Sequence, residues 1–331
     1  PSQAESIAER LRRRVHDFHF TDEAMPIAVT TSIGMVLFQE ASQPETILAL
    51  ADTALQSAKD QGKNRVVTIY ARESDLERLA EESRLITRIR NSLAENRFLI
   101  HFQPIVDLRD GKIDHLEALI RLPGDDQLPM LPSKFLETAE RCGLMSNIDR
   151  WVVRSVLTIL NEHPLLSIFV NLSPKSLMDL SLLEFIESSV KKKGIQPGQL
   201  SFEITENTAI EDMELARTWM HRLMGLGCEF ALDDFGTGFS SFSHLRSLPA
   251  QYVKIDGSFV SNLDTDARNR ALVQALSTAV HAMGKQPIAD HVESASVVEI
   301  LQSLGVTKGQ GYHLGRPHAN WRQWLSEIRQ L

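Results

Sequence analysis

Two adjacent acidic residues, Asp233 and Asp234, follow a run of apolar residues with the composition of a buried parallel strand. Glycines flank Thr237 shortly afterwards, and a loop favours such residues more than a continuing strand does. Neighbouring carboxylates repel each other and raise each other's proton affinity unless a cation lies between them. Because a solvated turn explains an isolated Asp-Asp pair equally well, the residues at the ends of the other strands decide between these interpretations.

Polar side chains recur at the expected carboxyl ends of seven strand-like runs. They are Glu117, Asn171, Glu203, Asp233 with Asp234, Lys254, Asp290 and Gln310. In Phe202–Thr205 the acidic residue alternates with apolar neighbours, which directs its side chain away from theirs. Isolated acids are costly to bury without a partner, so this recurrence favours a shared ligand site over a set of surface residues.

The candidate ligands are hard oxygen atoms without a cluster of histidines or cysteines, which favours Mg²⁺ or Mn²⁺ over Zn²⁺. The carboxylates suffice for two ions, and Asp233 is the natural bridge because it lies beside Asp234. Two ions about 4 Å apart can activate a water molecule and stabilise the leaving oxygen of a phosphodiester. Lys254 is expected to orient that water or to offset phosphate charge, and a structural salt bridge is its alternative role.

Eight strand-like runs are expected to position these side chains. They are Phe98–Val106, His115–Arg121, Ser167–Leu172, Gln199–Thr205, Glu229–Asp233, Gln251–Ile255, Gln286–Val292 and Lys308–Leu314. Helical stretches lie between most of them, which is typical of a (β/α)₈ TIM-like barrel. Only Asp107–Asp114 joins the first two runs, too short for a crossover helix, so the first strand is expected to be antiparallel to the others.

The preceding residues 1–70 contain helical and strand-like segments but too few for a comfortable independent core, so they are interpreted as a partial α+β domain. Within them, residues 27–38 have the composition of one strand interrupted by Gly34. Residues 71–96 are highly charged with an apolar helical stripe. They are interpreted as a connecting helix, either packed on its own domain or forming a coiled-coil-like signal connector.

The composition is that of a globular protein: 331 residues, 43% hydrophobic, 24% charged, with a net charge of −8. The negative charge argues against long nucleic acid as the partner but permits a small nucleotide held by metal ions. Two distant cysteines and no membrane-length apolar run indicate a cytoplasmic fragment. Since the chain opens with Pro-Ser-Gln, an upstream sensor or an inner-membrane anchor in the parent chain remains open.

Residues 85–320 resemble the EAL domain, the cyclic-di-GMP phosphodiesterase family named for the triplet Glu117-Ala-Leu119. The matching motifs are Gln103-Pro-Ile-Val106, Asn171-Leu-Ser173, Glu203-Ile-Thr-Glu206, Asp233-Asp-Phe-Gly-Thr-Gly238, Lys254-Ile-Asp256, Gln310-Gly-Tyr312 and Gly315-Arg-Pro317. Residues 1–70 resemble the C-terminal part of a GGDEF (diguanylate cyclase) domain through Thr31-Ser-Ile-Gly34 and Gly62-Lys-Asn-Arg65. That family's GTP-binding loop lies upstream of these motifs, so no cyclase activity is expected of this chain. The resulting division is 1–70, a GGDEF-like segment; 71–96, the helix; and 97–331, the EAL barrel.

The resemblance implies hydrolysis of cyclic-di-GMP to linear pGpG with Mg²⁺ or Mn²⁺. It implies metal ligands at Glu117, Asn171, Glu203, Asp233 and Asp234, with Asp290 also in the metal site. Further implied roles are water positioning by Lys254, an active-site amide at Gln310, bracing of the loop Asp233–Ser241 by Glu206, and substrate contacts at Gln103, Arg121 and Glu293. In this family that loop links catalysis to dimer contacts, so a homodimer is expected.

One departure affects the expected activity. The family usually has Ala-Glu-Gly-Val-Glu where this chain has Ala289-Asp-His-Val-Glu293. Asp290 keeps the charge but loses one methylene of reach, on the order of 1.5 Å, and catalytic geometry tolerates little misplacement. A catalytically weak or silent cyclic-di-GMP receptor is therefore the alternative to the enzyme. A nuclease is disfavoured because no basic, aromatic-interleaved stripe is present, and a kinase because Asp233-Asp-Phe-Gly lacks every accompanying kinase motif.

Overall fold

The computed structural model describes residues 2–22, 25–38, 44–70, 73–124, 128–236 and 242–324. The chain divides into two compact units, one ending at Arg88 and the other beginning at Ile89, so the division falls inside helix α3 (Glu73–Ala94). This helix lies where the connecting helix is predicted, although the predicted domain limits themselves stay a prediction. Among the described residues, no helix is both long and apolar enough to cross a membrane.

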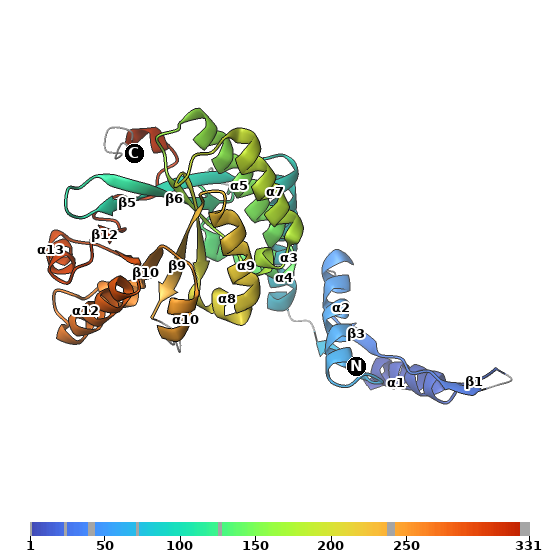
Figure 1. The fold of residues 1–331 in the computed structure, drawn as a ribbon. Helices are drawn as coiled ribbons and strands as arrows, with labels where there is room; N and C mark the ends of the chain where they lie inside the picture. Colours follow the sequence, from blue (N-terminus) through green and yellow to red (C-terminus); the bar gives the residue numbers. More distant parts are fainter. Residues whose placement is uncertain are drawn as a thin grey trace. The chain divides into compact units, whose positions relative to one another are not determined.

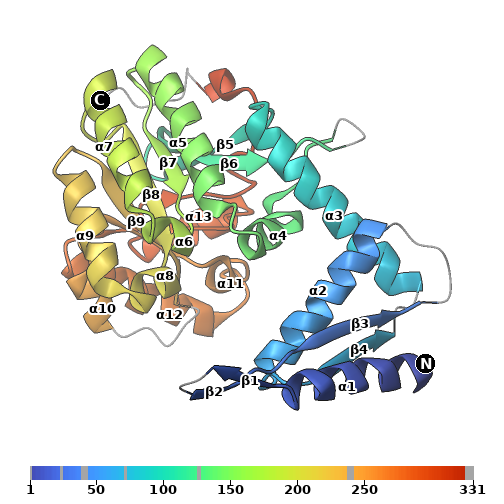
Figure 2. The ribbon, with the colours of Figure 1, turned by 90° about the vertical axis from the view of Figure 1, so that its right-hand side faces the viewer.

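The first unit contains two small sheets and two complete helices. Strands β1 (His19–Asp22) and β2 (Met25–Ala28) form an antiparallel pair, and β3 (Ile33–Leu37) and β4 (Val66–Tyr70) form a parallel pair. Helices α1 (Ser2–His16) and α2 (Pro44–Asp60) both contact the β3–β4 pair (Figure 2). The single strand expected over residues 27–38 is wrong, because β2 ends at Ala28 and β3 begins at Ile33.

The second unit is a closed eight-stranded barrel surrounded by helices, which confirms the predicted fold (Figure 1). Its strands follow the order β10-β11-β12-β5-β6-β7-β8-β9. They are β5 (Leu99–Asp107), β6 (Ile113–Arg121), β7 (Ile168–Asn171), β8 (Leu200–Thr205), β9 (Glu229–Phe235), β10 (Tyr252–Ile255), β11 (Gln286–Ala289) and β12 (Lys308–Gly309). β5 is antiparallel to both of its neighbours, as the short β5–β6 connection requires, and the other pairs are parallel.

The helices of this unit lie between consecutive strands, except for η2, which follows the last strand. They are η1 (Pro132–Lys134), α4 (Leu136–Arg141), α5 (Met145–Glu162), α6 (Pro174–Leu177), α7 (Leu180–Lys193), α8 (Glu206–Glu211), α9 (Met213–Met224), α10 (Phe242–Ser247), α11 (Gly257–Val260), α12 (Ala267–Ala282), α13 (Ala295–Ser303) and η2 (Trp321–Trp324). Side chains that accept hydrogen bonds from the first backbone N–H groups begin several of them, such as Thr205 at α8 and Asp266 at α12.

Five buried residues from different strands form a cluster inside the barrel: Ile105, Phe169, Ala231, Tyr252 and Ile288. Side chains two residues apart in a strand lie on the same face, so the next inward layer on each parallel strand comes two residues later. That layer contains Asn171 after Phe169, Asp233 after Ala231, Lys254 after Tyr252 and Asp290 after Ile288. The polar side chains at the barrel mouth therefore lie directly above this apolar layer.

Candidate active site at the barrel mouth

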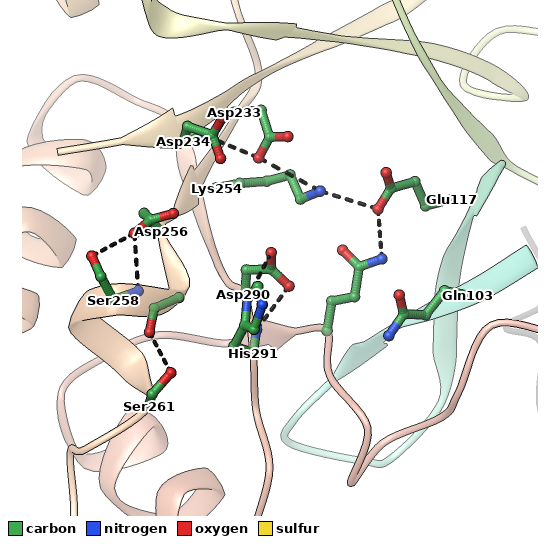
Figure 3. A network of polar contacts seen from close by, with 12 residues as sticks. Gln103, Glu117, Asp233, Asp234, Lys254, Asp256, Ser258, Ser261, Asp290 and His291 are labelled. Carbon is green, nitrogen blue, oxygen red and sulfur yellow. Dashed lines mark hydrogen bonds and ion pairs between the residues drawn. The ribbon is translucent and has the colours of Figure 1, made fainter. Parts of the chain in front are cut away.

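The ammonium group of Lys254 is the centre of the polar layer. Its Nζ donates to Glu203 Oε2 at 2.9 Å and to Glu117 Oε2 at 3.1 Å, and it lies 3.6 Å from Asp233 Oδ1. Figure 3 shows this side chain extending from β10 toward Glu117 on β6, with Asp233 approaching from β9. Three strands that are distant in the sequence thus place carboxylates around one cation.

Glu117 connects further strands to the same group. Its Oε1 accepts a hydrogen bond from Asn171 Nδ2 at 2.7 Å, and its Oε2 accepts one from Gln310 Nε2 at 2.6 Å. Glu117 is buried, whereas Asn171 is exposed at the end of β7. With its nitrogen used in this way, the Asn171 amide keeps its oxygen available at the mouth.

Negative charge exceeds positive charge in this layer, because three carboxylates surround one ammonium. Burial raises the pKa of Glu203 well above its usual value, and the nearby charge of Glu117 adds to the shift. Burial likewise raises the pKa of Asp233 to about 6 despite the opposing effect of Lys254. The Lys254 pKa is also raised, since three carboxylates outweigh the opposing effect of burial, so this side chain stays charged. Two fully buried oxygens, Glu203 Oε1 and Gln310 Oε1, lack a hydrogen-bond partner.

Asp234 lies at the rim of the mouth rather than in this buried group. It is exposed, and its backbone has a positive φ of 55° while its N–H donates to Asp233 Oδ1 at 3.0 Å. This left-handed conformation turns two consecutive side chains toward different surroundings. Burial and then the nearby charge of Asp256 raise the Asp234 pKa. Asp256 was not among the predicted site residues, although it belongs to the Lys254-Ile-Asp256 motif, and its carboxylate also accepts from Ser258 N at 2.9 Å.

Asp290 is engaged by its neighbour, His291. Its Oδ1 accepts the His291 backbone N–H at 2.7 Å, and its Oδ2 lies 3.1 Å from His291 Nδ1 (Figure 3). His291 has a φ of 56°, and its ring packs so closely on Gly257 that a Cβ there would lie 2.2 Å from Nδ1. Both carboxylate oxygens of Asp290 thus have partners on the adjacent residue.

The other predicted residues lie around this centre. Gln103 pairs with Glu117 in the β5–β6 register and donates to Gly315 O at 3.1 Å. Arg121 is buried and donates to the Ile120 carbonyl at 2.9 Å. Glu206 is buried at the start of α8, and its Oε2 accepts Gly236 N at 3.4 Å, whereas residues 237–241 of the predicted loop lie outside the described residues.

Glu293 is exposed beyond β11 and makes none of the contacts that join the central residues. Within the described part of the chain, no three carboxylate, histidine or cysteine side chains already converge at metal-binding distances. The Lys254 ammonium lies instead among three carboxylates, the buried Glu117 and Glu203 and the partly buried Asp233. The structure therefore gathers Glu117, Asn171, Glu203, Asp233, Lys254 and Gln310, while Asp234 and Asp290 lie near enough to Lys254 for their charges to interact with it.

Comparison with known proteins identifies this arrangement. The EAL domain family matches residues 86–317, and the diguanylate cyclase GGDEF domain family matches residues 1–65. The chain belongs to the EAL domain family. The matched region covers the whole described barrel, including each residue of the polar layer, and the second match covers the part predicted as a GGDEF fragment.

Similar proteins include the cyclic di-GMP phosphodiesterase PdeB of Shewanella oneidensis, 34% identical over 82% of this chain and 32% of the relative. The bifunctional diguanylate cyclase/cyclic di-GMP phosphodiesterase MucR of Pseudomonas aeruginosa is 31% identical over 96% of this chain and 47% of its own length. The chain thus spans about a third to a half of these relatives.

Two solved structures resemble the barrel. A Pseudomonas aeruginosa FimX EAL domain bound to c-di-GMP superposes with a TM-score of 0.67 and 35% identity, covering 71% of this chain and 96% of that chain. A MucR phosphodiesterase in complex with c-di-GMP has a TM-score of 0.68 and 30% identity, covering 72% and 99%. Both structures contain bound c-di-GMP.

Proposed function

We propose that this EAL barrel hydrolyses cyclic-di-GMP to linear pGpG. The observation that carries the proposal is the convergence of oxygen ligands and a charged lysine on one barrel mouth, in a chain that belongs to the EAL family. Relatives named cyclic di-GMP phosphodiesterases and barrels with bound c-di-GMP support the same reaction. Incubating the purified chain with cyclic-di-GMP and Mg²⁺ or Mn²⁺, followed by separation of the products, tests it directly.

The mouth residues fit divalent cations. Excess carboxylate charge, two buried oxygens without partners and the available Asn171 amide oxygen are what a hard cation requires. We assign the ligands to Glu117, Asn171, Glu203, Asp233, Asp234 and Asp290, enough for two ions. Such ions, Mg²⁺ or Mn²⁺, would activate a water molecule and stabilise the charge that develops on the phosphate.

The chain's own residues would bind the substrate and orient the groups at the barrel mouth. Lys254, held in its charged form by three carboxylates, cannot accept a proton, so its role is to donate hydrogen bonds and to offset phosphate charge. Gln310 and Asn171 hold Glu117 in position from two sides. Glu206 braces the start of the loop after β9, and we assign substrate contacts to Gln103, Arg121 and Glu293 around the rim.

A second candidate function is a cyclic-di-GMP receptor with weak or silent catalysis. The observation that favours it is the double contact between Asp290 and His291, which occupies both oxygens of a carboxylate that is already short for its role. One experiment separates the candidates: a receptor binds cyclic-di-GMP without producing pGpG when metal is saturating.

Lengthening Asp290 is expected to improve catalysis. Asp290→Glu extends the carboxylate beyond His291, so it should raise turnover or lower the metal concentration required. Asp290→Asn keeps the shape but removes the charge, so it should lower turnover about a hundredfold while leaving cyclic-di-GMP affinity nearly unchanged. Steady-state kinetics and calorimetric binding measure both effects. If Asp290→Asn hydrolyses as fast as the parent, Asp290 is not a working ligand.

Divalent metal should stabilise the fold more at pH 8 than at pH 5. The folded-state pKa of Asp233, about 6, lies above its usual 3.8, so the folded state binds more protons and stability falls as pH rises through this window. Glu203 shifts in the same direction. A cation offsets the charges that appear, and a thermal unfolding series with and without Mg²⁺ measures the gain. Equal stabilisation by Mg²⁺ at both pH values would show that Asp233 and Glu203 are not metal ligands.

Three further expectations stay predictions. They are a homodimer formed beside the loop Asp233–Ser241, an upstream sensor or further GGDEF region in the parent chain, and a cytoplasmic location with or without an inner-membrane anchor. The relatives are longer than this chain, which is compatible with additional domains in a parent protein. The dimer is proposed from the family resemblance and from the two glycines of this loop, of which residues 237–241 lie outside the described residues.

A further inference from the structure

A second polar pocket opens at the amino-terminal end of the barrel, opposite the mouth. Its volume is about 560 Å³, within the usual range for pockets that hold small molecules. The residues that line it lie at or before the starts of strands β6 to β12. Its polar lining includes Asp114, His115, Ser167, Glu229, Tyr252 and Lys308. None of these residues has a role in the proposed hydrolysis.

His115 is held in one orientation in this pocket. Its Nδ1 lies 3.0 Å from Asp114 Oδ2, and Asp114 also forms an ion pair with Lys308. Because the Asp114 carboxylate can only accept in this pair, Nδ1 carries the proton that is donated. The ring packs against Phe169 and Tyr252, with ring centroids 4.6 Å and 5.4 Å away. This packing determines where the second ring nitrogen lies.

That second nitrogen, Nε2, is buried without a hydrogen-bond partner, and His115 as a whole is only 6% exposed. Its nearest charged neighbour is Glu229 Oε2 at 3.7 Å, too long for a hydrogen bond. In the neutral imidazole, Nε2 and the Glu229 carboxylate are both acceptors, so each lacks a strong donor. Tyr252 supplies one hydrogen bond to Glu229 at 3.1 Å.

Glu229 is the most accessible charge in this pocket. Its side chain is 31% exposed, compared with 15% for Asp114 and 7% for Lys308. Burial opposes a proton on His115, but the hydrogen bond with Asp114 and the nearby charge of Glu229 outweigh it and raise the His115 pKa. When the imidazole is neutral, Nε2 can accept a hydrogen bond, and the negative charge of Glu229 favours a bound cation beside it.

We propose that this pocket binds a small organic cation whose ammonium or amidinium group donates hydrogen bonds to Glu229 and to His115 Nε2. A group with several N–H donors satisfies both acceptors at once and neutralises the one carboxylate that lacks a cationic partner within hydrogen-bond distance. His115 precedes Glu117 by two residues on β6, so the ligand lies beneath the layer that carries the proposed metal ligands.

Titration of the full chain with butylammonium chloride, without cyclic-di-GMP or divalent metal, tests the proposal. Calorimetry should show saturable millimolar binding, and Glu229→Gln should weaken it about tenfold or more because a charged hydrogen bond is lost. Glu299→Gln is the matched control, since it removes the same charge from an exposed site on α13 and should leave affinity unchanged. A far-ultraviolet circular dichroism spectrum and a thermal unfolding curve close to those of the parent would show that Glu229→Gln is folded.

A second measurement uses the parental chain alone. In ¹⁵N-histidine spectra, with the His115 signal assigned by His115→Gln, the Nε2 resonance should move on addition of butylammonium. Tetramethylammonium, which has no N–H donor, and butyrate should leave it in place. Absence of butylammonium binding, equal binding of tetramethylammonium or butyrate, or equal weakening by Glu299→Gln would each overturn the proposal. None of these outcomes depends on hydrolysis at the mouth.

Discussion

Glu117→Ala is expected to lower cyclic-di-GMP turnover by roughly a thousandfold, close to complete loss. This carboxylate accepts hydrogen bonds from Asn171, Lys254 and Gln310, so its removal deletes a proposed metal ligand and releases three neighbours. Initial rates at saturating Mg²⁺, with pGpG quantified after separation, measure the effect. Near-parental turnover would remove Glu117 from the metal site.

Unfolding is not the expected cause of this loss. The charge of Glu117 contributes to the raised pKa of Glu203, so deleting it also relieves repulsion in the buried layer. Far-ultraviolet circular dichroism and thermal unfolding should therefore remain close to the parent. Glu137→Ala is a suitable control, because its side chain is 82% exposed on α4 and pairs with Arg141 on the same helix. It should retain full activity.

The order of elements in the barrel could be predicted from the sequence because parallel strands and helices have different apolar patterns. The antiparallel first strand followed from the short connection after β5. The strand ends were predicted less well: β11 stops at Ala289 and β12 at Gly309, both earlier than expected. Beyond β11, His291 adopts a left-handed conformation, which the residue types alone do not reveal.

The role of Gly34 depends on tertiary packing, which an interpretation of the local sequence does not include. The sequence suggests that this glycine interrupts a strand, yet it lies within β3. A Cβ at this position would lie 2.3 Å from both Ala51 O and Leu55 N, so only glycine permits α2 to pack this closely. The requirement comes from a helix that follows later in the chain, and no local pattern around Gly34 contains it.

The site residues were predictable by type, because polar side chains recur at the carboxyl ends of the strands. Their partners were not. The salt bridge considered for Lys254 proves to be a contact with carboxylates from three other strands, and this depends on the closure of the barrel. The Asp290–His291 contact depends on a backbone angle, and the pocket around His115 depends on residues from five strands and from the loops that precede β7 and β8.

Lys254→Met is expected to abolish hydrolysis and to destabilise the chain by about 3–5 kcal/mol at pH 8 in the absence of divalent metal, because it leaves buried carboxylates without their cation. The pKa values of Glu203 and Asp233 are already raised by burial, and loss of the ammonium raises them further. The folded variant therefore binds more protons than the unfolded chain, so its stability should recover as pH falls. Urea unfolding at pH 8 and pH 5 measures this recovery of stability. At pH 8, Mg²⁺ should restore part of the same stability.

A second buried lysine provides the matched control. Lys285 is 8% exposed and donates to the carbonyl oxygens of Leu248 and Ala250 at 2.7 and 2.8 Å, with burial lowering its pKa. Lys285→Met should also destabilise the chain, since two buried carbonyls lose their donor, but it leaves no carboxylate unpaired. Its loss of stability should therefore not be recovered by acid or by Mg²⁺. If neither acid nor Mg²⁺ restores the stability of Lys254→Met, the carboxylates around Lys254 are not the source of its destabilisation. The electrostatic account of this site is then wrong.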